Sequence, residues 1–512
     1  MSRRGPATPA SYTHGVAFEV LSFVLILILG VGSGIAIARI YGLQVMGEYA
    51  LAFAPTMMLG MLSTVREQTG FVRMVATLAP RDPQITGLWA ATFLFSTALT
   101  CAMAVPVFAL TWWIFTGPMD RPELVGNAAL VMGMYVLFSN PAFNLDRVFT
   151  SFRAGQSLLW IRLFQASLIA AASIGAGLVW GTTLSLLLAE TLAWIPALIW
   201  RAAIVHRWMP IRVPVSVVRD GLRELPRIVR FGLQLVPGDI AEAGLQQAGT
   251  WLVAFVAPIG AVGAYSRAYQ LARRLYELRA RVAEMLFPTL IERERAGDVA
   301  GGERVLMDSV RYVLLALTLV AAAGGGAAGG VMDLFGPGFD QAAPALALLL
   351  LIAPVATCSF VQFQALWAAG LAVKTTWISI ARTVVGLTAM ALLTWQMGIT
   401  GAALGQLLGY AFGFAVTSVL TVRSLTQPFG ALMSVRQVIA VPLGYGAGFV
   451  VARAVDEAFG FAAVGVPVAL AAGSLAFAAV ALAVGGLNDR DRDRVDRLRR
   501  KLARAQLEPQ GL

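Results

Sequence analysis

Apolar residues run along this chain in long blocks, and the polar segments that separate the blocks are short. A helix that crosses a bilayer needs about 20 apolar residues, and blocks of about that length follow one another almost from end to end. The polar segments are too short to fold as separate soluble domains. The pattern therefore predicts an all-α integral membrane protein with about 14 transmembrane helices, at residues 16–40, 47–65, 86–115, 123–144, 157–179, 182–203, 231–256, 262–290, 305–331, 341–369, 374–396, 400–422, 435–453 and 461–485.

Composition agrees with this interpretation and excludes several others. The 512 residues are 58% hydrophobic and 13% charged, whereas a soluble globular domain carries about 25% charged residues. The two cysteines, Cys101 and Cys358, lie in apolar segments far apart, and the two histidines are His14 and His206. Because these groups are few and widely separated, neither a disulfide nor a metal site is predicted, and no cofactor is expected.

Basic residues are distributed unevenly between the two sides of the predicted membrane. With the N-terminus inside, about 28 of the 39 Lys and Arg residues fall in cytoplasmic segments and about 3 in outer ones. The densest clusters are residues 201–230 and 490–504. This asymmetry requires an even number of spans, so both termini are expected in the cytoplasm. The formal charge of +11 then reports topology, and no nucleic-acid partner is expected.

The basic tail allows two interpretations. Val495, Leu498 and Leu502 recur at helical spacing among arginines, as in an amphipathic helix that lies on anionic membrane lipid. A solvated tail that only fixes the orientation of the chain is the alternative.

Three features recur about 216 positions apart and predict an internal repeat. They are Gly-x-Tyr-x-x-Ala at 47–52 and 263–268, Ala-Gly at 154–155 and 369–370, and glycine at 181 and 398. Each pair has the same place in the helix count, which predicts two parallel six-helix pseudo-repeats, with substrate between them, plus two extra C-terminal helices. The expected parts are an N-lobe at 1–215, a C-lobe at 216–430, helices 13 and 14 at 431–487 and a cytoplasmic basic tail at 488–512.

The eighth segment is unusually polar for a spanning helix. Each Arg at the bilayer centre costs about 2.5–3.5 kcal/mol on insertion scales, so its five arginines cannot all face lipid. At 100° per residue, six polar side chains fall within roughly 100° of arc: Arg267, Gln270, Arg274, Glu277, Arg281 and Glu284.

This stripe is expected to line a water-filled cavity. Guanidinium groups offer forked donors to phosphate oxygens, which makes Arg267, Gln270, Arg274 and Arg281 the candidate substrate-binding residues. For the inner half of the helix, including Arg281, the alternative is that the helix projects into the cytoplasm and its charges are solvated.

Segment 7 supplies candidates for ion coupling. Pro237-Gly238 is expected to break the helix, and Asp239, Glu242 and Gln246 follow on one face. Carboxylates beside a helix break can bind a proton or Na⁺, so Asp239 and Glu242, together with Glu277 of segment 8, are candidates for coupling to an H⁺ or Na⁺ gradient. The alternative is that they neutralise the arginines of segment 8.

Other polar residues lie inside the apolar segments. They are Glu19, Asn140, Asn144, Arg162, Glu190 and Arg382. Several stand near helix ends, so interfacial snorkelling is expected for most of them.

The sequence argues against an enzyme. It contains no P-loop, no HExxH motif and no nucleophile elbow. Its outer loops are too short to hold the catalytic groups of a membrane glycosyltransferase or polymerase. A transporter is expected instead.

Short motifs spread over nearly the whole chain resemble those of polysaccharide-type flippases. They lie, in order, at residues 38–49 (ARIYG to GEY), 263–271 (GAYSRAYQL), 286–290 (LFPTL), 334–339 (LFGPGF) and 398–403 (GITGAA). Their order and spacing resemble the polysaccharide transport family of the multidrug/oligosaccharidyl-lipid/polysaccharide exporter superfamily.

The resemblance implies a flippase of the bacterial inner (cytoplasmic) membrane. Such proteins move undecaprenyl-pyrophosphate-linked oligosaccharide repeat units to the outer leaflet by alternating access, for exopolysaccharide, capsule or O-antigen assembly. The resemblance also implies polysaccharide polymerase and export proteins as partners. A basic cavity suits this lipid-linked cargo because the pyrophosphate must be neutralised inside the membrane.

Two other functions of the same fold stay open. A multidrug/cation antiporter would favour an acidic or aromatic cavity, which the arginines of segment 8 oppose. Lipid II flippases carry a basic residue two positions after the motif alanine, Ala268, where this chain has Gln270. They also carry extra arginines in helix 1 that this chain lacks, although Arg267 and Arg274 could substitute on the same face.

Overall fold

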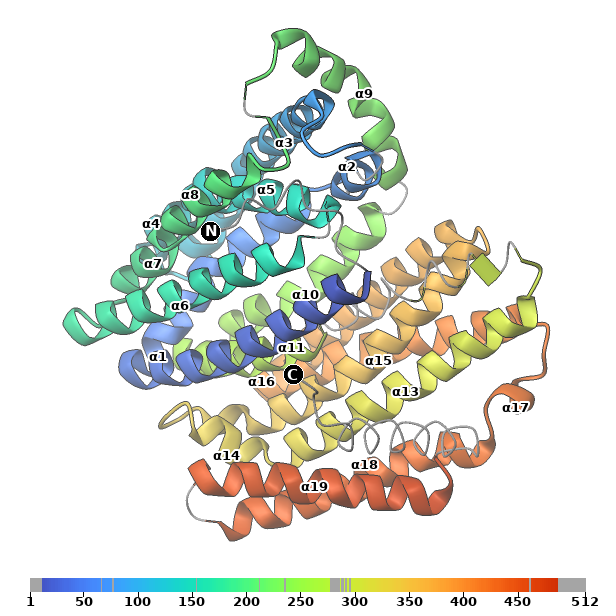
Figure 1. Ribbon diagram of the computed structural model, residues 1–512. Helices are drawn as coiled ribbons and strands as arrows, with labels where there is room; N and C mark the ends of the chain where they lie inside the picture. Colours follow the sequence, from blue (N-terminus) through green and yellow to red (C-terminus); the bar gives the residue numbers. More distant parts are fainter. Residues whose placement is uncertain are drawn as a thin grey trace, which may run out of the picture. The chain divides into compact units, whose positions relative to one another are not determined.

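The computed structural model describes most of the chain, and every regular element in the described part is a helix (Figure 1). For a few helical residues (12–24, 69, 73, 231, 232, 372 and 431) it describes the backbone alone. The described residues are 12–65, 67–75, 78–152, 154–210, 212–233, 236–276, 286, 290, 292–293, 296–459 and 462–486.

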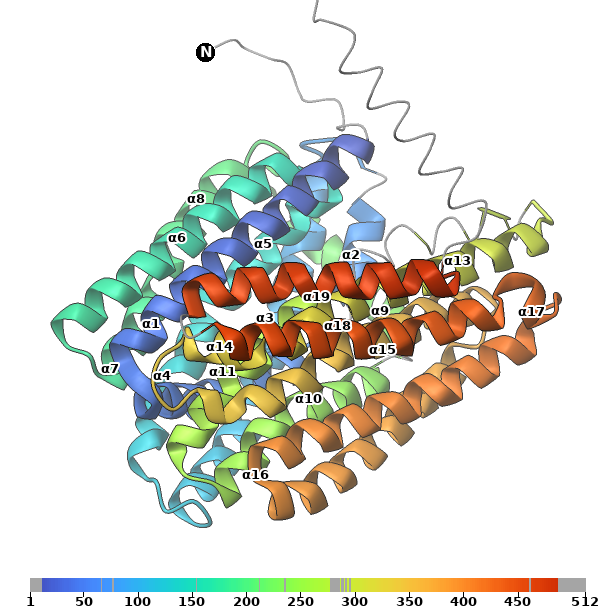
Figure 2. The same cartoon turned by 90° about the horizontal axis from the view of Figure 1, so that it is seen from below.

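Ten described helices are long and apolar enough to cross a membrane, so the chain is an all-α, multi-pass membrane protein. Two of the ten are double-length. Helix α1 (Tyr12–Leu62) contains Gly42 at φ 75°, and α16 (Ala372–Ser424) contains Gly398 at φ 56°. Glycine adopts these left-handed conformations without steric cost, so each long helix is two helices joined at a sharp turn. Figure 2 shows the two halves of α16 running side by side.

The chain divides into two compact units, the first comprising residues 1–274, 332–345 and 371–413. After α1, this unit contains α2 (Glu67–Val75), α3 (Pro83–Thr116), α4 (Glu123–Met134), the π-helix η1 (Tyr135–Ser139), α5 (Asn140–Ser151), α6 (Gly155–Val179), α7 (Thr183–Leu192), α8 (Trp194–Val205), α9 (Val215–Leu233), α10 (Val236–Val256) and most of α11 (Ile259–Tyr276). The elements α4, η1 and α5 follow one another without a break and form one candidate span, Glu123–Ser151, which confirms the span predicted at 123–144.

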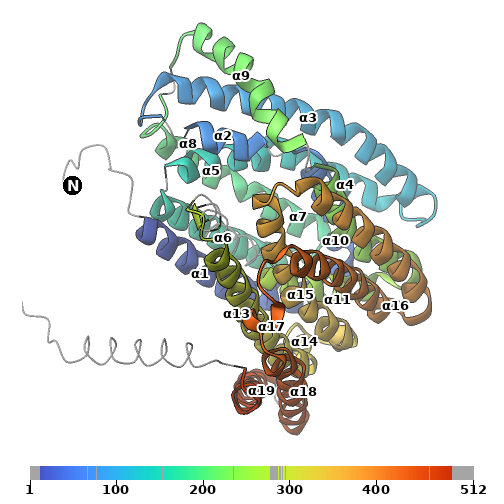
Figure 3. The same ribbon diagram turned by 90° about the vertical axis from the view of Figure 1, so that its right-hand side faces the viewer.

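Helix α9 was not predicted, because its sequence is a charged linker rather than an apolar block. It lies across α3 and beside α2 (Figure 3). A Cβ atom placed on Gly221 would lie 2.1 Å from the carbonyl oxygen of Gly87, and one on Gly70 would lie 2.7 Å from that of Ile228. Glycine at these two positions therefore lets α9 approach the backbones of its neighbours.

Two of the family-like motifs meet in this first unit. The Nε atom of Arg39 donates to the carbonyl oxygen of Leu334 at 2.7 Å. This bond joins the turn after the first half of α1 to the Leu334–Phe339 loop, although the two segments lie almost 300 positions apart.

The second unit comprises residues 275–331, 346–370 and 414–512. Its helices are α13 (Val299–Gly326), most of α14 (Ala328–Asp333), most of α15 (Ala343–Ala368), the last part of α16, α17 (Phe429–Leu432), α18 (Val435–Ala458) and α19 (Ala462–Val484). The short 3₁₀ helix η2 (Asp340–Ala342), which precedes α15, and most of α16 belong to the first unit. The helices α18 and α19 match predicted helices 13 and 14.

Small residues bring α18, α19 and α13 together. A Cβ atom on Gly448 would lie 2.9 Å from the carbonyl oxygen of Gly473 and 3.1 Å from the Cβ of Ala322. Such spacing is typical of membrane helices that pack through small residues. The basic tail predicted at 488–512 lies outside the described residues.

Candidate functional site

Two of the predicted arginines lie over one face of α1. A Cβ atom placed on Gly34 would lie 4.0 Å from Nη1 of Arg267, and one placed on Gly30 would lie 3.9 Å from Nη2 of Arg274. The two glycines are one helical turn apart, so their missing side chains leave room for both guanidinium groups. The structure thus brings Arg267 and Arg274 of α11 together along the N-terminal half of α1.

Arg267 is half-buried and is held by neutral partners. Its Nη1 donates to Oε1 of Gln270 at 3.1 Å, and its guanidinium carbon lies 5.7 Å from the ring centroid of Tyr49. Nη2 contacts the sulfur of Met46 at 2.7 Å, and Nε is buried without a hydrogen-bond partner. No carboxylate in the described part of the chain forms an ion pair with Arg267, so its charge has capacity to bind an anion.

Tyr49 connects this arginine to a carboxylate on a third helix. While its ring lies under the guanidinium, its hydroxyl donates to Oε2 of Glu190 on α7. A second contact of the same kind joins the two helices, because the hydroxyl of Thr183 donates to Oε2 of Glu48. From its sequence position, Glu190 was expected only to snorkel. A single acid in the run of leucines from Leu184 was the signal that could have singled it out.

The rest of the predicted stripe is described only in part. Gln270 and Arg274 are both exposed, which agrees with a polar face along α11. Arg281 and Glu277 lie outside the described residues. The substrate-binding and ion-coupling roles assigned to these residues stay predictions.

The carboxylates of segment 7 lie at the start of a helix. Pro237 and Gly238 occupy the first turn of α10, where proline is well tolerated. The predicted span 231–256 is divided next to these two residues, since α9 ends at Leu233 and α10 begins at Val236. Gly238 lies close to α16, because a Cβ atom placed on it would be 3.4 Å from the Cα of Thr376.

Glu242 of α10 forms a buried ion pair with Arg382 of α16. Its Oε2 lies 3.1 Å from Nη2 of Arg382, and the two side chains are 15% and 3% exposed. Oε1 of Glu242 accepts a hydrogen bond from Gln246, and the Arg382 guanidinium lies 4.9 Å from the ring centroid of Tyr410. Snorkelling is thus wrong for Arg382, which is buried in protein. The positive charge of Arg382 balances the negative charge of Glu242, which is one of the candidate coupling carboxylates.

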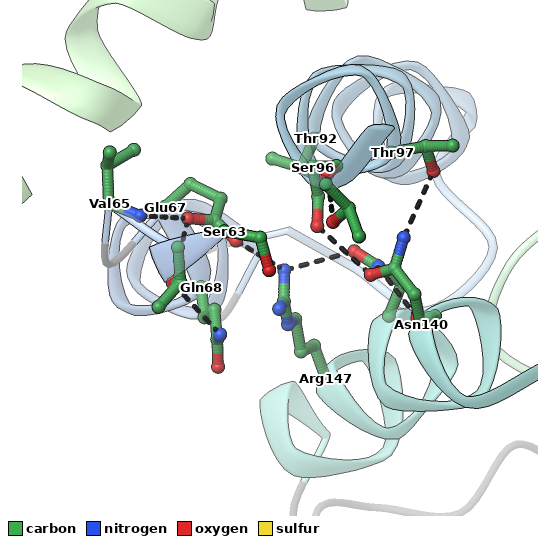
Figure 4. A network of polar contacts seen from close by, with 12 residues as sticks. Ser63, Val65, Glu67, Gln68, Thr92, Ser96, Thr97, Asn140 and Arg147 are labelled. Carbon is green, nitrogen blue, oxygen red and sulfur yellow. Dashed lines mark hydrogen bonds and ion pairs between the residues drawn. The ribbon is translucent and has the colours of Figure 1, made fainter. Parts of the chain in front are cut away.

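A second buried network joins α2, α3 and α5 (Figure 4). Nη1 of Arg147 lies 3.1 Å from Oε1 of Glu67 and donates to Oδ1 of Asn144 at 3.0 Å. Asn144 donates to Oδ1 of Asn140, which also accepts from Ser96. Asn140 and Asn144 are buried and hydrogen-bonded, so snorkelling is wrong for them too.

A third cluster, on the next face of α5, surrounds Asp146. Its carboxylate lies 2.7 Å from Nε of Arg201 on α8 and 3.8 Å from Nε of Arg162 on α6. Arg201 also donates to Oε1 of Gln165 at 2.7 Å. Because α5 is tied through Arg147 to α2 and through Asp146 to α6 and α8, these charges act as fixed structural pairs.

The comparisons with known proteins agree with this architecture. Residues 89–293 match the family model described as polysaccharide biosynthesis protein. A structure of the lipid II flippase MurJ in an inward closed conformation is similar over 93% of this chain and 99% of that chain, with a TM-score of 0.64 and 12% identity. A multidrug resistance MATE family transporter of the MOP superfamily, in an inward-facing conformation, is similar over 80% of this chain and 98% of that chain, with a TM-score of 0.62 and 12% identity. Comparison with curated proteins gives no match. At such identities the structural similarity establishes the fold alone.

Proposed function

We propose that this chain is a transporter, not an enzyme, and that it acts as a lipid-linked oligosaccharide flippase. The match of residues 89–293 to the polysaccharide biosynthesis protein family model and the similarity of the fold to MurJ and to a MATE transporter of the MOP superfamily support this proposal. The chain's substrate is an undecaprenyl-pyrophosphate-linked repeat unit, which it moves from the inner to the outer leaflet of the bacterial inner membrane. The polymer served is an exopolysaccharide, a capsule or an O-antigen, and a polysaccharide polymerase acts on the flipped unit.

One observation carries the proposal. Arg267 and Arg274 lie together over Gly30 and Gly34 of α1. The partners that the described residues offer Arg267 are neutral side chains, those of Gln270, Met46 and Tyr49. A cation inside a membrane protein is costly unless a partner or a function compensates it. The pyrophosphate of a lipid-linked sugar supplies the missing charge, and the exposed Gln270 adds an amide beside it.

The proposed topology has fourteen spans with both termini in the cytoplasm. The ten apolar helices include two that are double-length, and α10 and α11 add two further membrane-length helices that are more polar. The positive-inside distribution of Lys and Arg supports this orientation.

In the proposed mechanism the lobes 1–215 and 216–430 are two six-helix halves related by a pseudo-two-fold axis. The substrate would lie between them and become accessible from the two sides of the membrane in turn. Gly181 and Gly398, an equivalent pair, both adopt positive φ, at 60° and 56°. Exposed tryptophans also recur in equivalent places: Trp160 on α6 and Trp180 directly after it, and Trp377 and Trp395 on α16. Each tryptophan pair spans about 27–30 Å of helix at 1.5 Å per residue, the thickness of a hydrocarbon core, so the same length of each half would face lipid.

The proposal is tested in a strain that lacks the gene. Loss of surface polymer with accumulation of undecaprenyl-linked repeat units on the inner leaflet is the expected result. An Arg267→Ala/Arg274→Ala double variant should fail to restore the polymer although it inserts stably. Arg453→Ala, which removes an exposed arginine paired with Glu457, is the matched control and should restore it.

Three results would overturn the proposal. Normal polymer with the double variant would mean that the arginine pair does not bind the cargo. Unchanged polymer in the deletion strain, together with new drug sensitivity, would favour a multidrug/cation antiporter. Accumulation of peptidoglycan precursors instead of repeat units would favour a lipid II flippase.

A further inference from the structure

Glu190 is placed so that it can respond to an anion at Arg267. It lies on α7 in the membrane-spanning part of the first unit, and in the described part of the chain its carboxylate accepts a hydrogen bond from Tyr49. The ring of the same tyrosine lies against the Arg267 guanidinium, at 5.7 Å. The tyrosine therefore contacts the cation with its ring and the anion with its hydroxyl.

The other charged groups around α7 have partners of their own. On α1, the carboxylate of Glu48 accepts a hydrogen bond from the hydroxyl of Thr183. At the start of α4, Glu123 forms an ion pair with Arg121. On α6 and α8, Arg162 and Arg201 both pair with Asp146. Among the described residues, Glu190 is the carboxylate that Tyr49 links to Arg267.

An ionised Glu190 neutralises part of the positive charge of Arg267, and this is the charge that an incoming anion would bind. Charges interact strongly in a low-dielectric membrane protein, so a pyrophosphate at Arg267 and an ionised carboxylate behind Tyr49 disfavour each other. A proton added to the Glu190 carboxylate from water removes this repulsion, and no other bond has to form or break.

We propose that Glu190 links proton binding to anion binding at Arg267. The inference rests on the proposed function, because it takes the Arg267 region as the pyrophosphate site. The link is reciprocal by thermodynamic necessity. Protonation of Glu190 tightens anion binding, and a bound anion makes Glu190 easier to protonate. Anion affinity therefore falls as the pH rises through the titration of Glu190.

The experiment measures binding of inorganic pyrophosphate to the purified full-length protein between pH 5 and pH 8. Each variant is compared with the parent protein at the same pH, so the titration of pyrophosphate itself cancels. Glu190→Gln should bind about 5-fold or more tightly than the parent at pH 8 and about equally at pH 5. Glu48→Gln, which alters the other carboxylate contact between α1 and α7, should follow the parent at every pH.

A second variant keeps the test decisive if Glu190→Gln does not fold. Tyr49→Phe retains the ring beside Arg267 and removes the hydroxyl that contacts Glu190, so the pH dependence should become shallower. Binding that is unchanged in Arg267→Ala would overturn the proposed site. Binding lost in Arg267→Ala, with parent-like pH profiles in both Glu190→Gln and Tyr49→Phe, would leave the site standing and overturn the link.

Discussion

Gly47 and Gly263 make reciprocal contacts across one helix crossing. A Cβ atom placed on Gly47 would lie 2.1 Å from the carbonyl oxygen of Ile259, and one placed on Gly263 would lie 2.3 Å from that of Leu43. The separation of 216 positions between the two glycines also separates Leu43 from Ile259. Exchange of equivalent contacts is the property of an interface around a two-fold axis, and it supports the six-helix repeat proposed for this chain.

Adding a methyl group at this crossing should destabilise the protein. Gly47→Ala and Gly263→Ala each place a carbon against backbone that cannot move away alone, and overpacking of this kind costs about 1–3 kcal/mol. Thermal unfolding of the purified protein measures the change. Gly32→Ala is the control, because nothing lies within 4 Å of a Cβ at Gly32. Equal melting temperatures for the three variants would contradict the close crossing.

Breaking the Glu242–Arg382 pair should be costly. Glu242→Ala leaves a guanidinium that is 3% exposed without this carboxylate, and removal of one partner of a buried ion pair costs about 3–5 kcal/mol. Glu242→Leu/Arg382→Met, which removes both charges, should recover much of that stability. A double variant no more stable than Glu242→Ala would contradict a direct pairing.

The same residues test ion coupling. If Glu242 or Asp239 couples flipping to an H⁺ or Na⁺ gradient, Asp239→Asn/Glu242→Gln should lower transport and make the remainder insensitive to an uncoupler. Transport at the parent rate, with the parent's sensitivity to the uncoupler, would show that the carboxylates have a structural role alone.

Buried and exposed ion pairs should differ strongly in their contributions. Arg147→Met leaves Glu67, which is fully buried, without the guanidinium in Figure 4, and we expect a loss of about 3–5 kcal/mol. Arg453→Met breaks a pair whose side chains are more than half exposed, where about 0–1 kcal/mol is typical. Chemical denaturation of both variants measures the difference, and similar losses would contradict the buried network.

Thiol labelling tests the proposed topology. The native Cys358 is buried and Cys101 lies in the apolar helix α3, so neither should react with a membrane-impermeant maleimide. Asp120→Cys, in the loop before α4, should be labelled on intact cells. Arg207→Cys, after α8, should be labelled only once the inner membrane is opened, and the reverse pattern would invert the chain.

Local sequence properties are enough to identify this chain as a helical membrane protein and to locate most of its spans. Hydrophobic length and the positions of Lys and Arg are properties of short segments, so α3, α6, α18 and α19 could be found without tertiary information. The amphipathic helix α9 was missed because a charged linker has no apolar block. The two halves of α1 and of α16 were predicted as separate spans. The interruptions of the apolar pattern near Gly42 and Gly398 that separate them are likewise visible in a short stretch of sequence.

The polar partnerships were decided by tertiary structure alone. Arg382 and Asn140 have the same local surroundings whether they snorkel or are buried, and only folding places Glu242 and Ser96 beside them. Tyr49 and Glu190 likewise stand 141 positions apart and meet through the packing of α1 on α7. In the membrane interior a polar group is stable only when another polar group satisfies it, and which group does so depends on helix packing, which is not local in the sequence.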